Sequence, residues 1–373
     1  MAENSKEELK NELSTGIKSE KAVSTSLLKK RWRKFKSLKR GYYSFLVIVF
    51  LYLISFIVSV FVGRDALIVK YNDSYHFPIF KFYLGTDLGQ DIQGEANYRL
   101  LKEQFKAQDK GNWVLLPIYP YGPNENLLSE LDGNPPHPPM VRDINGSGIH
   151  IFGTDNRGRD VFVRLVYGFR TGISFSLIVT AISFLIGISI GAVCGYFGGK
   201  TDIIIQRIIE IWSTLPFLYV IIIISSIIQP NFFLLIMILT LFGWISMTYY
   251  IRGEFYREKA RDYVSAAVSM GATNKKIIFR HILPNALTPV ISYAPFTIVA
   301  NIFSLVSLDF LGFGLPPPTP SWGELMGQGL ENIDNWWLIM TPLAIMFLTL
   351  LCITFIGEAI REAFDPKVYS RLK

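Results

Sequence analysis

Residues Arg252 to Pro284 read RGEFYREKARDYVSAAVSMGATNKKIIFRHILP, a basic stretch between two strongly apolar ones. Ala266 and Ala267 are adjacent on a predicted short helix, and two small side chains leave a shallow face that another surface can approach. Gly271 predicts a sharp turn, because a residue without Cβ adopts left-handed backbone angles at little cost. Pro284 predicts the start of a second helix, since its missing N–H costs nothing in a first turn. We call residues 252–285 the docking loop, because this helix, turn and helix would give a soluble partner a rigid handle.

The composition indicates a membrane protein. Half of the 373 residues are hydrophobic and 18% are charged, which is too apolar for a soluble chain of this length. Apolar runs long enough to cross a bilayer occur at residues 42–62, 173–197, 211–228, 232–251, 282–311 and 336–356. We therefore expect an all-α polytopic membrane protein with six transmembrane helices.

Charge predicts the topology. Before Gly41 there are twelve Lys/Arg against five Asp/Glu, and from Arg252 to Arg280 there are seven against three. Basic segments near membrane spans stay in the cytoplasm, so both termini and the docking loop are expected there. A basic tail beside an apolar helix is more simply a topology signal than a nucleic-acid-binding arm, and we expect no nucleic-acid partner.

The chain divides into five predicted parts. Residues 1–41 form a cytoplasmic basic tail, disordered up to about residue 28, and 42–62 form the first span. Residues 63–150 hold eight Lys/Arg and eleven Asp/Glu; they predict a small mixed periplasmic insertion with a β-hairpin around Asn72-Asp73. Residues 151–365 form a core with five spans and the docking loop, and 366–373 form a cytoplasmic tail.

Glycine spacing marks a packing face on the second span. Gly187, Gly191 and Gly195 recur every four residues, which places them on one helix face for close approach to a neighbour. The following Gly199-Lys200-Thr201 resembles the end of a phosphate-binding loop, but the motif needs a glycine where Cys194 stands. We therefore expect no nucleotide or other cofactor site in this chain, and the scattered positions of His76, His137, His150 and His281 predict no metal site.

The segment before the second span carries charged residues. Thr154 or Asp155 is expected to cap a helix whose first turn holds Asp160 and which continues through residues 161–170. This helix has one apolar face, which allows two interpretations. It is either a helix on the solvated outer surface, or an element that acts as a gate or a receptor contact and includes Arg159. Asp309 lies near the outer end of an apolar helix, where an ionisable group is usually buried against a partner or a cavity. The preferred explanation is that Asp309 makes a structural hydrogen bond with a neighbouring helix. The alternative is that it binds the amino group of a peptide substrate.

The docking loop resembles the cytoplasmic EAA loop of ABC importer permeases, through which an ATPase subunit acts on the membrane domain. Ala266, Ala267, Gly271, Leu283 and Pro284 match that pattern at its spacing. Ser265 stands where the pattern has glutamate, and Asp262 one turn earlier is a candidate replacement. Further similarity to the second permease of dipeptide and oligopeptide importers lies in residues 40–44, 153–160, 195–199, 307–312 and 357–358.

The resemblance implies a type I importer permease in a bacterial inner membrane, for oligopeptides or peptide-like compounds of the microcin C kind. It implies as partners a second homologous permease, two ATP-binding subunits that hold ATP and magnesium, a periplasmic peptide-binding protein and membrane lipid. Transport by alternating access would be coupled through the docking loop. Candidate residues for the translocation path or a gate are Trp244, Asp309, Asp155, Arg159 and Asp160.

Three other classes compete with this interpretation. A standalone secondary peptide carrier would often show inverted repeats and mid-membrane charges, and the sequence has no convincing repeat. A membrane-anchored sensor would make the five later spans superfluous. An enzyme would need a nucleophile elbow, a zinc motif or paired carboxylates, and none is visible.

Overall fold

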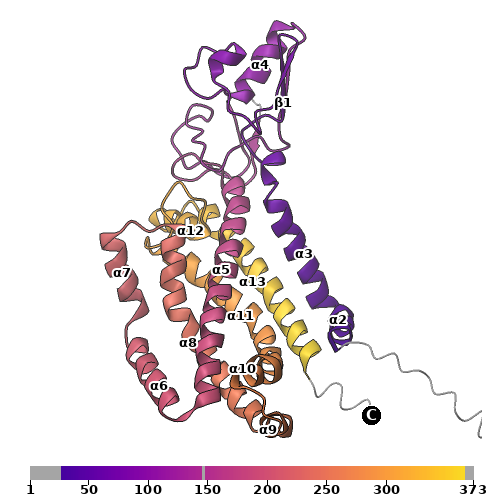
Figure 1. The fold of residues 1–373 in the computed structure, drawn as a ribbon. Helices are drawn as coiled ribbons and strands as arrows, with labels where there is room; N and C mark the ends of the chain where they lie inside the picture. The colour runs from indigo at the N-terminus through magenta and orange to yellow at the C-terminus, as the bar shows by residue number, and fades with distance from the viewer. Residues whose placement is uncertain (1–26, 145–147, 366–373) are drawn as a thin grey trace, which may run out of the picture.

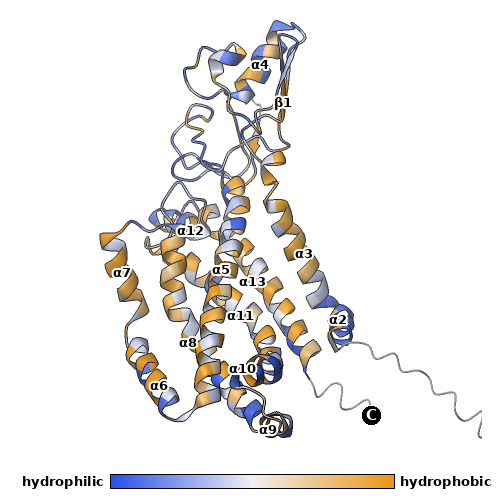
Figure 2. Cartoon of the chain, viewed as in Figure 1, coloured by the Kyte–Doolittle hydropathy of each residue, from blue (hydrophilic) through white to orange (hydrophobic). Residues whose placement is uncertain are grey.

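The structure of the protein is a computed structural model that describes residues 27–144 and 148–365. The predictions of a disordered N-terminus and of a C-terminal tail at 366–373 lie almost entirely outside the described residues. Long helices form a bundle, the segment between the first two long helices stands at one end, and the docking loop lies at the opposite end (Figure 1). Figure 2 shows that the bundle is predominantly hydrophobic and that polar residues concentrate at the two ends.

Among the residues that the structure describes, four helices are long and apolar enough to cross a membrane, and up to six spans result if two bent helix pairs each count as one. The single helices are α5 (Val161–Phe197), α8 (Phe232–Lys259), α11 (Leu283–Phe310), which continues a helical run from Asn274, and α13 (Trp337–Phe364). The bent pairs are α2 (Leu27–Ser37) with α3 (Lys39–Ser55), and α6 (Gly199–Ser213) with α7 (Phe217–Ile227).

Two predicted spans are wrong in detail. The first helix ends at Ser55 rather than Val62. At this end Arg170 donates to the Ser55 carbonyl, and Val58 packs with Tyr121 of the segment that follows. The third span is not one helix over 211–228. It breaks before Pro216, where α6 and α7 meet at 67°. α7 has 11 residues, about 17 Å of helix, which is short of a hydrocarbon core of about 30 Å.

The surface helix predicted at 161–170 is also wrong. These residues are the first turns of the 37-residue α5, which continues without interruption into the predicted second span. Val161 and Leu165 are buried against α11, α12 and α13 rather than lying on a surface. α12 (Trp322–Glu331), which the sequence analysis missed, lies in the Pro/Gly-rich segment before α13.

The segment between α3 and α5 has its own small core. The predicted hairpin at Asn72-Asp73 is confirmed, since β1 (Ile68–Tyr71) and β2 (Ser74–His76) pair antiparallel around two residues with positive φ. β3 (Trp113–Leu115) joins the other side of β1, and α4 (Tyr98–Gln108) packs its buried Leu101 and Phe105 against the sheet. β4 (Val141–Arg142) and β5 (Ile149–His150) form a second pair near α5, and short turns of 3₁₀-helix occur at Val58–Val60 and Gly85–Leu88.

The three in-register glycines of α5 face α8. A Cβ on Gly187 would lie 2.7 Å from Met247 Cβ, one on Gly191 2.6 Å from the Thr248 carbonyl oxygen, and one on Gly195 2.5 Å from Phe255 Cβ. All three distances are below normal contact, so the glycines allow the two helices to approach backbone to backbone.

Gly191→Ala is expected to destabilise the bundle by roughly 1–3 kcal/mol, because α8 must move to admit the methyl group. Gly172→Ala is the matched control: Gly172 is a buried glycine of the same helix whose added Cβ meets nothing within 4 Å. The check is the melting temperature of the two purified variants. An equal fall in the melting temperature of both variants would show that the loss of a glycine from the helix, and not the contact between α5 and α8, causes the destabilisation.

Candidate functional site

The docking loop folds as a short helix, a turn and a return into α11. α9 (Asp262–Ser269) packs Val264 into a hydrophobic cluster with α8 and the start of α11, and its Ala267 is also buried. Val268 and Met270 are 57% and 79% exposed, and Ser265 and Ala266 also lie on the outward face. The loop therefore presents a small, mostly uncharged surface on a helix whose other side is anchored.

This geometry corrects the predicted role of the alanine pair. Ala266 is exposed, but Ala267 is only 1% exposed and belongs to the buried face. Adjacent residues on a helix differ by about 100°, so the two alanines cannot share one docking face. Asp262 occupies the first turn of α9 on the exposed side, where a carboxylate interacts favourably with the helix dipole.

The turn after α9 has the predicted form. Gly271 has a φ of 74°, and a Cβ there would meet no atom within 4 Å. The requirement for glycine is thus conformational rather than steric. Thr273 caps α10 (Asn274–Lys276), which leads directly into the next helical segment.

Pro284 does not start a new helix from a loop. A π-helical segment, Ile277–Ile282, runs straight into α11, so the helical run is continuous from Asn274. Proline has no N–H to donate to the carbonyl four residues earlier, and the wider π turn accommodates that missing bond. Asn285 Nδ2 donates to the His281 carbonyl at 3.2 Å. Leu283, on the same turn, packs beside the hydrophobic cluster under α9.

Polar contacts fix the docking loop to the bundle. Asp202 of α6 receives two hydrogen bonds of 2.6 Å from Arg252 and one of 2.8 Å from Tyr256. Tyr196, at the end of α5, makes two such contacts. Its carbonyl accepts a 2.5 Å hydrogen bond from Lys259 of α8, and its hydroxyl donates to Asn274 Oδ1 at 2.7 Å. No local sequence pattern marks these residues, because the partners in each contact lie 50 or more positions apart.

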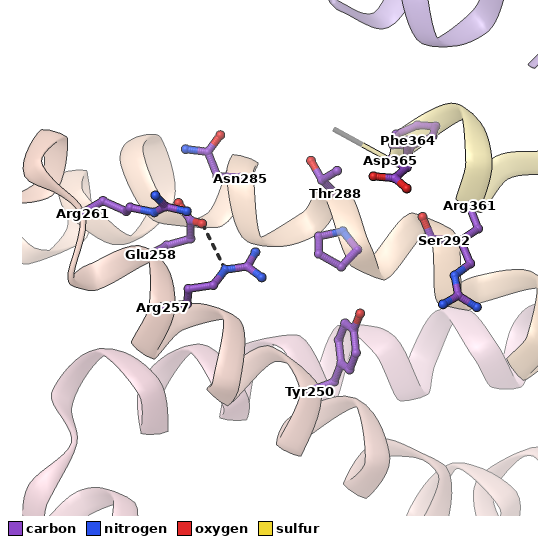
Figure 3. A pocket seen from close by; sticks show the side chains of 11 residues that line it. Tyr250, Arg257, Glu258, Arg261, Asn285, Thr288, Ser292, Arg361, Phe364 and Asp365 are labelled. Atoms are coloured by element: carbon purple, nitrogen blue, oxygen red, sulfur yellow. Dashed lines mark ion pairs between the residues drawn. The ribbon is translucent and has the colours of Figure 1, made fainter. Parts of the chain in front are cut away.

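A cleft of about 470 Å³ opens beside the docking loop between the ends of α8, α11 and α13 (Figure 3). Three arginines line it, Arg257, Arg261 and Arg361, together with the carboxylates of Glu258 and Asp365. Glu258 accepts a 2.8 Å hydrogen bond from Tyr263 of α9. The cleft is thus a polar, water-accessible mouth whose wall includes the base of the docking loop.

A buried ion network lies at the opposite end of the bundle. Asp155 and Glu324 both bind Arg159, at 2.6 and 2.9 Å, and Glu324 also binds Arg164. Asp155 and Arg164 are 0% exposed and Arg159 is 2% exposed. Burial alone would lower the pKa of Arg159, but hydrogen bonds and charge from Asp155, and then from Glu324, raise it above its ordinary value. Two cations and two anions therefore tie the start of α5 to α12.

Asp160 belongs to a second buried network rather than to the first turn of a helix. It is the N-cap of α5 and accepts from Val163 N, so the predicted cap at Thr154 or Asp155 is wrong. His150 Nδ1 and the Tyr119 hydroxyl each lie 2.6 Å from Asp160 Oδ2, and His150 Nε2 lies 2.9 Å from Asp143. Tyr121 donates to the same Asp143 at 2.6 Å.

The histidine of this network is expected to make stability pH-dependent. Burial alone would lower the pKa of His150, but hydrogen bonds to Asp143 and Asp160 outweigh it and raise the pKa to about 9. A raised pKa stabilises the fold fully below the ordinary value near 6.5 and loses that effect as pH rises through 9. The loss is on the order of 3 kcal/mol.

Melting temperatures between pH 6 and pH 10 provide the check. The wild-type value should fall between pH 6.5 and 9, and His150→Gln should flatten that segment. A parallel fall in both proteins would assign the effect to another group.

The other two candidates for the translocation path, Asp309 and Trp244, make hydrogen bonds to residues near them in the sequence. Asp309, 8% exposed near the end of α11, accepts from Leu315 N at 2.6 Å and from Ser321 Oγ. Ser321 is the N-cap of the neighbouring helix α12, so the predicted structural hydrogen bond with a neighbouring helix is confirmed, and Leu315 lies in the segment between the two helices. Trp244, on α8, donates to the Leu241 carbonyl at 2.8 Å, and its own carbonyl lies beside Gly187. Within the described residues no group of three metal-binding side chains occurs.

Comparison with known proteins identifies the family. The chain is 39% identical over 339 residues to the inner membrane ABC transporter permease protein YejE of Escherichia coli, covering 90% of this chain and 96% of that protein. This chain is an ABC transporter permease. The permease also matches the family model of the binding-protein-dependent transport system inner membrane component over residues 187–370, which contain the entire docking loop.

Two further relatives extend the match. The permease is 36% identical to the peptidoglycan transport system permease protein YejE of Agrobacterium fabrum, over 91% of this chain and 93% of that one. It is 37% identical to the oligopeptide transport system permease protein OppC of Haemophilus influenzae, over 59% of this chain and 71% of that protein. The family resemblance drawn from the docking loop is thereby confirmed.

Proposed function

We propose that this permease imports oligopeptides or peptide-like compounds as one membrane subunit of an ATP-driven complex. The observation that carries the proposal is the anchored, outward-facing α9 in a chain of the importer permease family. Relatives named for oligopeptide and peptidoglycan transport support a substrate with peptide bonds, and compounds of the microcin C type are the finer expectation.

The proposed topology has six spans, with each bent pair counted as one. Both termini and the docking loop face the cytoplasm, and residues 63–150 face the periplasm. The charge distribution supports this orientation, and so does the position of the docking loop at the end of the bundle opposite the 63–150 segment (Figure 1).

The proposed mechanism is alternating access. ATP closes two partner ATPase subunits, α9 moves with the subunit docked on it, and this permease rocks against a second homologous permease. Substrate from a periplasmic binding protein enters the outward-facing cavity and leaves at the end that holds the arginine-lined cleft. The contacts of Asp202 and Tyr196 support the mechanism, because a handle that is held firmly passes its displacement to the spans instead of absorbing it.

Proteoliposomes that hold the purified complex provide the test. Uptake of a labelled oligopeptide should require both internal ATP and the co-purified ATPase subunits. Uptake by the permease alone, driven by a proton gradient without ATP, would instead assign the chain to the secondary carriers.

A further inference from the structure

We propose that the groove between α2, α11 and α13 is a binding site for one anionic phospholipid. α2 reads LLKKRWRKFKS, with six lysines and arginines and no acid. Its axis makes an angle of 96° with α3, so if α3 crosses the bilayer, α2 lies along the membrane surface. Figure 2 shows α2 as a hydrophilic helix at the end of the bundle that holds the docking loop.

α2 is held firmly in this position. Phe35 is 5% exposed and packs against Ala359 and Ala363 of α13. Lys34 forms a 3.0 Å ion pair with Glu362, and the Arg31 guanidinium lies 4.6 Å from the centre of the Phe364 ring. The site is therefore a preformed feature of the fold rather than a property of a flexible tail.

The groove has the two parts that a phospholipid requires. Its volume is about 360 Å³, and seven of its eight lining residues are apolar, among them Trp32, Phe45 and Ile291. The eighth is Arg31, whose guanidinium lies over the ring of the lining residue Phe364, and we expect this cation to bind the phosphate. An acyl chain fits the apolar wall, and Trp32, which is 48% exposed, is of the residue type that anchors at the membrane interface.

The surrounding charge selects an anionic lipid. Within the part of the chain that the structure describes, Lys34 is the only one of the six cations of α2 with a carboxylate in ion-pair range. Each lysine or arginine near an anionic surface contributes about 1 kcal/mol, a factor of about five in affinity. The residues before α2 are the other candidate occupant of the groove, and they carry four lysines and five glutamates. Their charges nearly cancel, so they complement the basic surface of α2 less well than a lipid phosphate does.

Native mass spectrometry of the purified complex tests the proposal, with phosphatidylglycerol and phosphatidylcholine as probes. Retention of phosphatidylglycerol should exceed that of phosphatidylcholine at least fivefold. Arg31→Gln should remove most of this preference, and Arg33→Gln should retain it, because Arg33 lies on the same helix but does not line the groove. Ile291→Trp, which fills the groove without changing charge, should lower retention of both lipids.

Three results would overturn the proposal. They are equal retention of the two lipids by the wild type, equal effects of Arg31→Gln and Arg33→Gln, and lipid binding that occurs only after residues 1–26 are deleted. The last result would identify the N-terminal segment as the occupant of the groove. None of these outcomes depends on transport, so they are distinguishable from failure of the proposed function.

Discussion

Ala266→Asp is expected to abolish ATP-driven uptake while leaving the permease folded in the membrane. Ala266 lies on the exposed face of α9 beside Ser265, so the new carboxylate costs the isolated chain little. In the complex it would be buried against the ATPase subunit without a partner, which costs several kcal/mol. We expect at least a tenfold loss of co-purified ATPase subunit and of peptide-stimulated ATP hydrolysis.

Ala267→Asp is the matched comparison, one residue away with the same chemical change. Ala267 is 1% exposed on the buried side of α9, so an aspartate there is expected to destabilise the permease by roughly 3–5 kcal/mol and lower its yield. Gly271→Pro should also uncouple transport, because proline cannot adopt the φ of 74°. Normal ATPase binding by Ala266→Asp would disprove the docking role of this face.

Glu324→Gln is expected to cause the largest loss of stability at the opposite end, roughly 3 kcal/mol. The wild-type network balances Arg159 and Arg164 against Asp155 and Glu324, and neutralising Glu324 leaves one buried positive charge. The melting temperature of the purified complex is the measurement. Glu210→Gln is the control: it removes an acid from an exposed pair with Arg207, which contributes about 0–1 kcal/mol.

A double variant separates charge balance from packing. Arg164→Met combined with Glu324→Gln restores a neutral network of Asp155 with Arg159. The double variant should therefore be more stable than the sum of the two single losses predicts, by roughly 1–3 kcal/mol. Strict additivity would show that Arg164 acts through its hydrogen bonds to the carbonyls of Pro123 and Thr319 and not through charge.

Local sequence patterns predicted the parts of the fold that depend on local chemistry. Short alternating stretches on either side of Asn72-Asp73 predicted a hairpin, and the four-residue spacing of the glycines from Gly187 predicted a helix face for close packing. The break before Pro216 was missed, because the apolar run continues across it and hides the bend. Pairings such as Arg164 with Glu324, 160 positions apart, leave no trace in a single sequence.

The assignment of α9 failed in a different way. Its two alanines were predicted as one surface, but which side of a short helix is covered depends on where the helix lies against α8. That placement is set by Val264 and by the cluster around Phe255 and Ile282, which lie 9 and 18 positions from Val264 in the sequence, so the local pattern of α9 does not reveal which side they cover. A pattern of small residues therefore located the docking loop but could not orient it.

The length of α5 has a mechanical consequence. Its 37 residues make a rod about 55 Å long, nearly twice the thickness of the hydrocarbon core. One tip is clamped by Asp160, and the other is tied through Tyr196 to the docking loop. If the bilayer midplane serves as its pivot, a tilt that swings one tip inward swings the other outward, so a single helix would open one face of the membrane while it closes the other.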